Sequence, residues 1–74
     1  MSDLTEGKTP RHPSLASILR FFEYEHLPPN LRGVSETFHH LAHHLADTLP
    51  ASAELTVALR KLLESKDCAV RAAL

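Results

Sequence analysis

The sequence predicts an all-α fold, in which a short N-terminal helix precedes an antiparallel helical hairpin that is assembled as an oligomer. Three observations lead to this prediction. Proline-containing breaks at 26–29 and 49–50 divide the chain into three segments with helical periodicity. The linker that contains the second break is only about four residues long, which favours antiparallel neighbours. Finally, a chain of 74 residues buries too little apolar surface to be stable alone with so thin a core.

The first helix is expected at 13–25. We expect residues 1–12 to form a flexible arm and residues 13–74 to form one helical hairpin domain. Pro13 suits the first turn of a helix. Apolar residues then follow i, i+3, i+4 and i+7 spacing: Leu15, Ile18, Leu19 and Phe22. Pro28 ends this segment, because the residue before a proline is pushed out of the α region.

The second helix is expected to begin after Asn30, a residue type favoured at the N-cap, with Ser35 as the alternative start, and to end near Thr48. Its apolar residues alternate by three and four positions. They form a heptad-like seam that suits packing against another helix: Leu31, Val34, Phe38, Leu41 and Leu45.

The third helix is expected from Ala53 to Leu74, with Ser52 as its cap. This stretch contains no Gly or Pro and is rich in strong helix formers. One apolar stripe runs along it: Leu55, Leu59, Leu62, Ala69 and Ala73. Four apolar residues off the main seams would be exposed in a monomer, which favours an oligomer: Phe21, Leu63, Val70 and Leu74.

Arg60 and Arg71 are eleven residues apart, close to three helical turns, so they point the same way, with Lys61 beside them. Two interpretations remain open for these cations. Each arginine has an acidic residue four positions away, Glu64 or Asp67, that would neutralise it locally. Alternatively, arginines of several subunits converge and bind an anion.

The composition excludes several classes of function. A net charge of −1 argues against binding a DNA or RNA polymer, which requires many phosphate contacts. No apolar run approaches the length of a membrane span, and the N-terminus is too polar for a signal peptide, so we expect a cytoplasmic protein that contacts no membrane. The one cysteine, Cys68, cannot form an intramolecular disulfide and is expected to be a small buried apolar residue.

No catalytic pattern is present in the sequence. It has no Gly-rich phosphate loop and no nucleophile elbow, and the carboxylates of Glu23 and Glu25 lie on different helix faces and do not make an acid/base pair. We therefore expect a protein that is not an enzyme and that uses no cofactor.

Histidines are concentrated in the second helix, where HHLAHH occupies 39–44. His39/His43 and His40/His44 both have the i, i+4 spacing with which two imidazoles share a metal ion, and Asp47 is a possible third ligand. A closed zinc site needs four ligands, so no metal is assigned. The alternatives are a polar helix face, the lining of a ligand pocket or subunit contact, and a metal site.

Tyr24 and His26 lie at the corner after the first helix. An aromatic ring in such a position can stack on a nucleobase, and a neighbouring histidine can reach a phosphate. The alternative is a half-buried tyrosine that packs over the end of the hairpin with its hydroxyl in water.

Three short motifs carry a resemblance to a known family: Tyr24-x-x-Leu27, Phe38-His39-x-Leu41, and Arg60-x-x-Leu63 continued by Val70-Arg71-Ala72. Over residues 22–74 the chain resembles the phage-encoded helical-hairpin nucleotide sponges, the anti-CBASS and anti-Thoeris hairpin domain. The resemblance implies a homo-oligomer, commonly a hexamer, that binds cyclic di- or trinucleotides without cleaving them. Such proteins suppress antiphage signalling in the host bacterial cytoplasm.

The resemblance also implies roles for individual residues. Tyr24 corresponds to an aromatic residue that stacks on bases, and His39 stands where the family has a phosphate-binding lysine. Arg71 and Arg60 correspond to residues that line trinucleotide pockets, although the family has a small polar residue where this chain has Arg60. The candidate ligand-binding residues are therefore Tyr24, His26, His39, His43, Arg60, Lys61 and Arg71. The alternatives are a helical protein-interaction module and a His-rich metal-binding oligomer.

Overall fold

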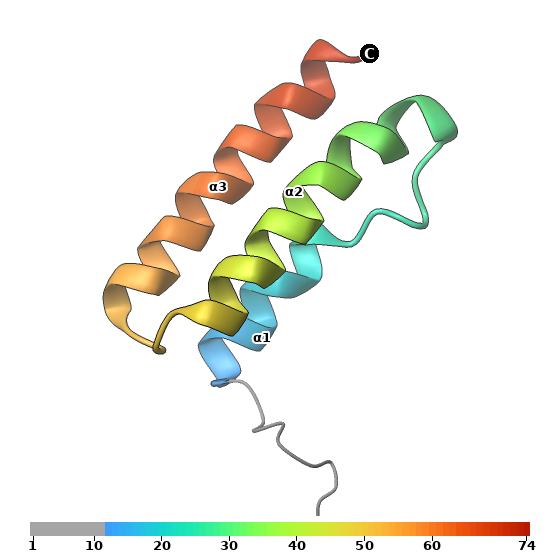
Figure 1. Ribbon diagram of the computed structural model, residues 1–74. Coiled ribbons are helices and arrows are strands. Elements are labelled where there is room, and N and C mark those ends of the chain that lie inside the picture. The colour runs from blue at the N-terminus through green and yellow to red at the C-terminus, as the bar shows by residue number, and fades with distance from the viewer. Residues whose placement is uncertain (1–11) are drawn as a thin grey trace, which may run out of the picture.

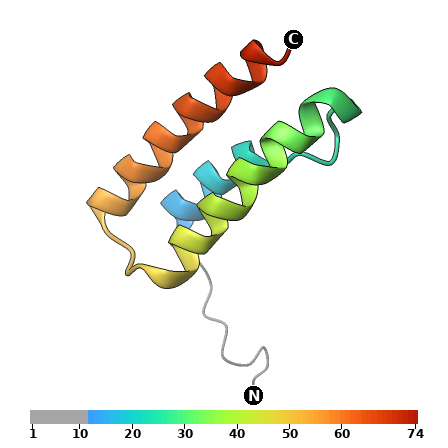
Figure 2. The same ribbon diagram turned by 45° about the horizontal axis from the view of Figure 1, so that its top comes forward.

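The protein is all-helical in the part of the chain that the computed structural model describes, residues 12–74. Figures 1 and 2 show the two long helices side by side, with the first helix packed against them. The predicted all-α fold with three helical segments is confirmed there, and that part contains no strand. The elements are α1 (Pro13–Leu19), the 3-10 turn η1 (Arg20–Phe22), α2 (Pro29–Thr48) and α3 (Ala53–Ala72). Of the predicted arm at 1–12, all but the last residue lies outside the described residues.

The first helix begins where it was predicted but ends early. His12 is its N-cap, and its Nδ1 accepts a hydrogen bond of 3.2 Å from the backbone N–H of Ser14. After η1, Glu23 has an extended backbone, with φ −64° and ψ 144°. The predicted continuation to Glu25 is therefore wrong. The carbonyls of Phe21 and Phe22 at this end instead meet side chains of α3 and α2.

The start of α2 corrects the expected N-caps. The helix begins at Pro29 with Pro28 as its N-cap and with no side-chain capping bond, so Asn30 is already helical and Ser35 lies inside the helix. Proline has a φ angle suited to the first helical position and lacks the N–H that would be left unsatisfied there. Arg32 contacts the preceding loop. Its Nη2 and Nε donate hydrogen bonds of 3.0 and 3.3 Å to the carbonyl of Leu27.

The buried face of α2 differs from the predicted seam. Ser35 and Ala42 are fully buried, whereas Leu41 is 45% exposed, so its place in the seam was wrong. The other predicted seam residues are half-buried. The helix α2 packs against both α3 and the α1–η1 segment. The side of α2 that faces the space between these two neighbours is therefore its most enclosed side. Small side chains there allow the helices to approach closely.

The third helix follows the prediction over most of its length. Ser52 caps it by accepting a hydrogen bond of 3.1 Å from the backbone N–H of Leu55, and the helix ends at Ala72, before the predicted Leu74. The predicted stripe faces inward, with Leu55 and Leu59 buried and its other members half-buried. The core draws on all three helices and η1: Leu15, Leu19, Phe22, Ala42, Leu55 and Leu59.

Large apolar side chains remain on the surface. Phe21 is 58% exposed and Leu74 is 82% exposed, as predicted for a single chain. Leu63 and Val70 are instead half-buried. Among the described helices, none is both long and apolar enough to cross a membrane.

Candidate functional site

Tyr24 and three histidines of α2 form an aromatic cluster, which we call the Tyr24–His cluster: Tyr24, His39, His40 and His43. The Tyr24 and His39 ring centroids are 5.0 Å apart at an interplanar angle of 66°. His39 also lies 4.3 Å from the His43 ring and 5.4 Å from the His40 ring. Edge-on and tilted contacts at such distances are typical of stabilising aromatic pairs. The structure thus brings together Tyr24, His39 and His43, which the sequence singled out, and adds His40.

His39 anchors the cluster to the end of η1. Its Nδ1 lies 3.2 Å from the carbonyl oxygen of Phe22. A carbonyl oxygen only accepts hydrogen bonds, so this contact requires a proton on Nδ1 and, in a neutral ring, leaves the lone pair on Nε2. The orientation of the imidazole is therefore set by a backbone group of the segment that precedes Tyr24.

Lys66 makes the matching contact from α3. Its Nζ donates a hydrogen bond of 2.7 Å to the carbonyl oxygen of Phe21. Two successive carbonyls at the end of η1 are thus bound by side chains, one from each long helix. Because Tyr24 follows two residues later, both contacts restrict where its ring lies.

The Tyr24–His cluster has one covered side and one open side. Tyr24, His39 and His43 are half-buried, whereas the His40 side chain is 67% exposed. His40 Nε2 lies 3.3 Å from the Oε2 of Glu36, one turn earlier on α2. The cluster can therefore offer an aromatic face, a phenolic hydroxyl and the remaining imidazole nitrogen atoms to a molecule that arrives from solvent.

His26, another predicted ligand residue, lies elsewhere. It is exposed in the loop between η1 and α2. The ring contacts described for Tyr24 join it to α2 histidines and not to its sequence neighbour. Proximity in sequence therefore did not identify the partners of Tyr24.

The three cations of α3 are all exposed. Lys61 Nζ lies 3.8 Å from the Oε1 of Glu64, and Arg71 Nη2 lies 3.4 Å from the Sγ of Cys68. In the first interpretation Glu64 would neutralise Arg60 and Asp67 would neutralise Arg71. The recorded contacts instead join Glu64 to Lys61 and Arg71 to Cys68. Cys68 itself is exposed, contrary to the expected buried position. These contacts stay within α3, so within one chain they do not link the cations to the Tyr24–His cluster.

A metal centre finds little support in the part of the chain that the structure describes. No group of three or more His, Cys, Asp or Glu residues is arranged there to hold a metal ion. His39 uses Nδ1 for the Phe22 carbonyl, and His40 faces Glu36. His39 Nδ1 and His40 Nε2 thus have separate hydrogen-bond partners.

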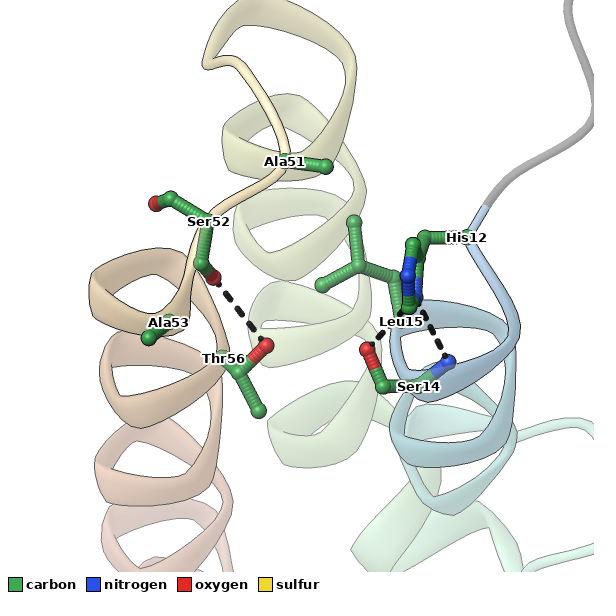
Figure 3. A pocket seen from close by; sticks show the side chains of 7 residues that line it. All are labelled: His12, Ser14, Leu15, Ala51, Ser52, Ala53 and Thr56. Carbon is green, nitrogen blue, oxygen red and sulfur yellow. Dashed lines mark hydrogen bonds between the residues drawn. The ribbon is translucent and has the colours of Figure 1, made fainter.

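A cavity of about 300 Å³ lies between the start of α1 and the connection from α2 to α3 (Figure 3). Its described lining contains no Lys or Arg, and its polar groups bond locally. His12 Nδ1 lies 2.9 Å from Ser14 Oγ, and Thr56 Oγ1 donates to the Ser52 carbonyl at 3.2 Å. The cavity contains none of the predicted ligand residues. It is lined by His12, Ser14, Leu15, Ala51, Ser52, Ala53 and Thr56.

The comparisons with known proteins add no relative. No protein-family model matches the chain, and neither the curated proteins nor the solved structures contain a match.

Proposed function

We propose that the protein captures a cyclic di- or trinucleotide without cleaving it. By lowering the free concentration of an immune second messenger, it would suppress antiphage signalling in the host bacterial cytoplasm. The observation that carries this proposal is the position of Tyr24, whose ring is held against His39 at a centroid distance of 5.0 Å in a half-buried corner. Stacking of a base on an aromatic ring contributes about 1–3 kcal/mol.

Preorganisation supports the proposal. His39 and Lys66 bind the two carbonyls that precede the loop carrying Tyr24. A ring that is already restricted in the free protein loses less conformational entropy when a ligand binds. A site restricted in this way can bind a nucleotide without a basic surface, in keeping with the net charge of −1.

Oligomerisation would supply the remaining phosphate contacts. In the proposed assembly, α2 and α3 form an antiparallel hairpin, and several hairpins associate as a homo-oligomer, with a hexamer as the expected state. The exposed side chains of Arg60 and Arg71 would then meet those of neighbouring subunits, where a cyclic nucleotide phosphate neutralises them. Association would also cover Phe21 and Leu74, the two most exposed large apolar side chains.

Capture without cleavage suits the chemistry of the cluster. An aromatic face and hydrogen-bond donors are sufficient to hold bases and phosphates, and no covalent step is required. His43, His26 and Lys61 are further candidate donors to phosphate, as the sequence predicted.

Calorimetric titration with cyclic di- and trinucleotides tests the proposal, followed by denaturation and chromatography of the recovered ligand. We expect binding with intact ligand. Tyr24→Ala should weaken binding of a ligand that stacks there about tenfold or more, since a stacking contribution of about 1–3 kcal/mol is removed. Tyr24→Phe is the matched control, because it keeps the aromatic ring. Absence of binding to any cyclic nucleotide at a hundredfold excess would overturn the proposal, as would recovery of a linear product.

A helical protein-interaction module is the second candidate, and the 58% exposure of Phe21 favours it. A charge at Phe21 would then abolish binding to a stoichiometric protein partner, whereas Tyr24→Ala would leave it intact. The opposite pattern, with nucleotide binding lost in Tyr24→Ala, favours the first candidate.

A further inference from the structure

Glu36, which the sequence analysis did not single out, lies at the open edge of the Tyr24–His cluster. Its Oε2 is 3.3 Å from His40 Nε2, and the His40 ring centroid is 6.3 Å from that of Tyr24. The Glu36 side chain is 46% exposed, so the carboxylate is restrained by the helix surface on one side and accessible from solvent on the other. A hydrogen-bond acceptor with negative charge is thus linked through His40 to the proposed stacking ring.

A carboxylate in this position is unfavourable for phosphate and favourable only for particular bases. It repels an anionic ligand unless it accepts hydrogen bonds from that ligand. Guanine offers N1–H and N2–H as adjacent donors, which match the two oxygens of a carboxylate. Adenine offers a single amino group beside the N1 acceptor, whose lone pair would face the carboxylate.

We propose that Glu36 is a specificity-determining residue that selects guanine-containing cyclic nucleotides over their adenine counterparts. This inference rests on the proposed function, with guanine stacked on Tyr24 and its donor edge turned toward Glu36. His40 keeps the carboxylate near the ring through its contact with Oε2. Each carboxylate oxygen accepts more than one hydrogen bond, so the same group can bind His40 and the base together.

The test compares the affinities of the protein for cyclic di-GMP and cyclic di-AMP. These two nucleotides have the same sugar–phosphate ring and differ only in the base. The wild-type protein should bind cyclic di-GMP at least about tenfold more tightly than cyclic di-AMP, as expected for a bidentate base contact. Glu36→Gln keeps the shape of the side chain but has only one oxygen that can accept a hydrogen bond. The two nucleotides should therefore bind this variant with nearly equal affinity. Glu54→Gln removes the same charge at an exposed position on α3 and should keep the wild-type preference.

The outcomes separate this inference from the proposed function. Equal affinity for the two nucleotides, or a preference for cyclic di-AMP, overturns the role of Glu36 while capture itself stands. Retention of the preference in Glu36→Gln, or its loss in Glu54→Gln, also overturns that role. Binding of neither nucleotide, nor of any cyclic trinucleotide, overturns both. Circular dichroism of both variants should match the wild type, because the substituted side chains are at least partly exposed.

Discussion

Lys66 on α3 donates a hydrogen bond of 2.7 Å to the carbonyl of Phe21, forty-five positions earlier in the chain. This contact joins the last helix to the end of η1, and His39 joins α2 to the next carbonyl, that of Phe22, at 3.2 Å. The loop that carries Tyr24 therefore begins from a point bound by both long helices.

Replacing Lys66 should destabilise the protein and loosen the Tyr24 loop. In Lys66→Met the Phe21 carbonyl loses its charged donor, and we expect a loss of about 1 kcal/mol, or about 4–8 °C in melting temperature. Denaturant unfolding at fixed protein concentration measures the loss in the free energy of unfolding. Lys61→Met is the matched control, since the Lys61–Glu64 pair is exposed, at 70% and 61%, and contributes little. Equal effects of the two substitutions would show that the hydrogen bond to Phe21 does not contribute to stability.

Replacing Ser35 by alanine should stabilise the protein. Ser35 Oγ is fully buried in the described structure and has no hydrogen-bond partner there. Removing an unsatisfied buried hydroxyl removes the cost of desolvating it, so the free energy of unfolding should rise by about 1 kcal/mol or more. Ser17→Ala, at an exposed position in α1, measures the gain in helix propensity alone and is the control. Ser35→Leu should cost about 1–3 kcal/mol through overpacking. A destabilised Ser35→Ala variant would indicate a hydrogen bond that forms in solution.

Removing metal ions should leave the protein unchanged. Among residues 12–74 no group of three or more His, Cys, Asp or Glu residues is placed to hold a metal. The melting temperature measured with EDTA should therefore equal that measured without it. A fall of several degrees that zinc reverses would support the metal-binding alternative for the HHLAHH segment.

The proposed oligomer should depend on exposed apolar side chains. Light scattering after size-exclusion chromatography should give a multiple of the 8.2 kDa chain mass at micromolar concentration. Phe21→Asp should lower that mass, because a charge at this exposed ring opposes burial in an interface. Glu54→Gln is expected to leave the mass unchanged. A wild-type protein that elutes as a well-folded monomer would contradict the proposed assembly.

The starts of the first and third helices were better predicted than the end of the first helix, for a physical reason. Pro13 and Ser52 mark starts through chemistry confined to one turn, and the structure confirms both. The end of the first helix lies against groups that are distant in the sequence. His39 and Lys66 meet the carbonyls of η1, and nothing near Glu25 in the sequence signals these contacts.

The buried face of α2 shows the same limit. Periodicity selected the large apolar residues, among them Leu41, which is 45% exposed. The most enclosed positions belong to Ser35 and Ala42, because two neighbouring segments approach α2 from different directions. A pattern within one helix does not specify how many neighbours it will have.

The sequence by itself determined the all-α class with three helical segments, the starts of the first and third helices, and the residue types behind the nucleotide-capture hypothesis. Only the tertiary structure decided that Tyr24 lies against His39 and not His26, and that Glu36 reaches the edge of that cluster through His40. Helical periodicity describes which residues of one helix share a face. Contacts between segments depend on how the helices are rotated and placed against one another, which is decided by packing of the whole core.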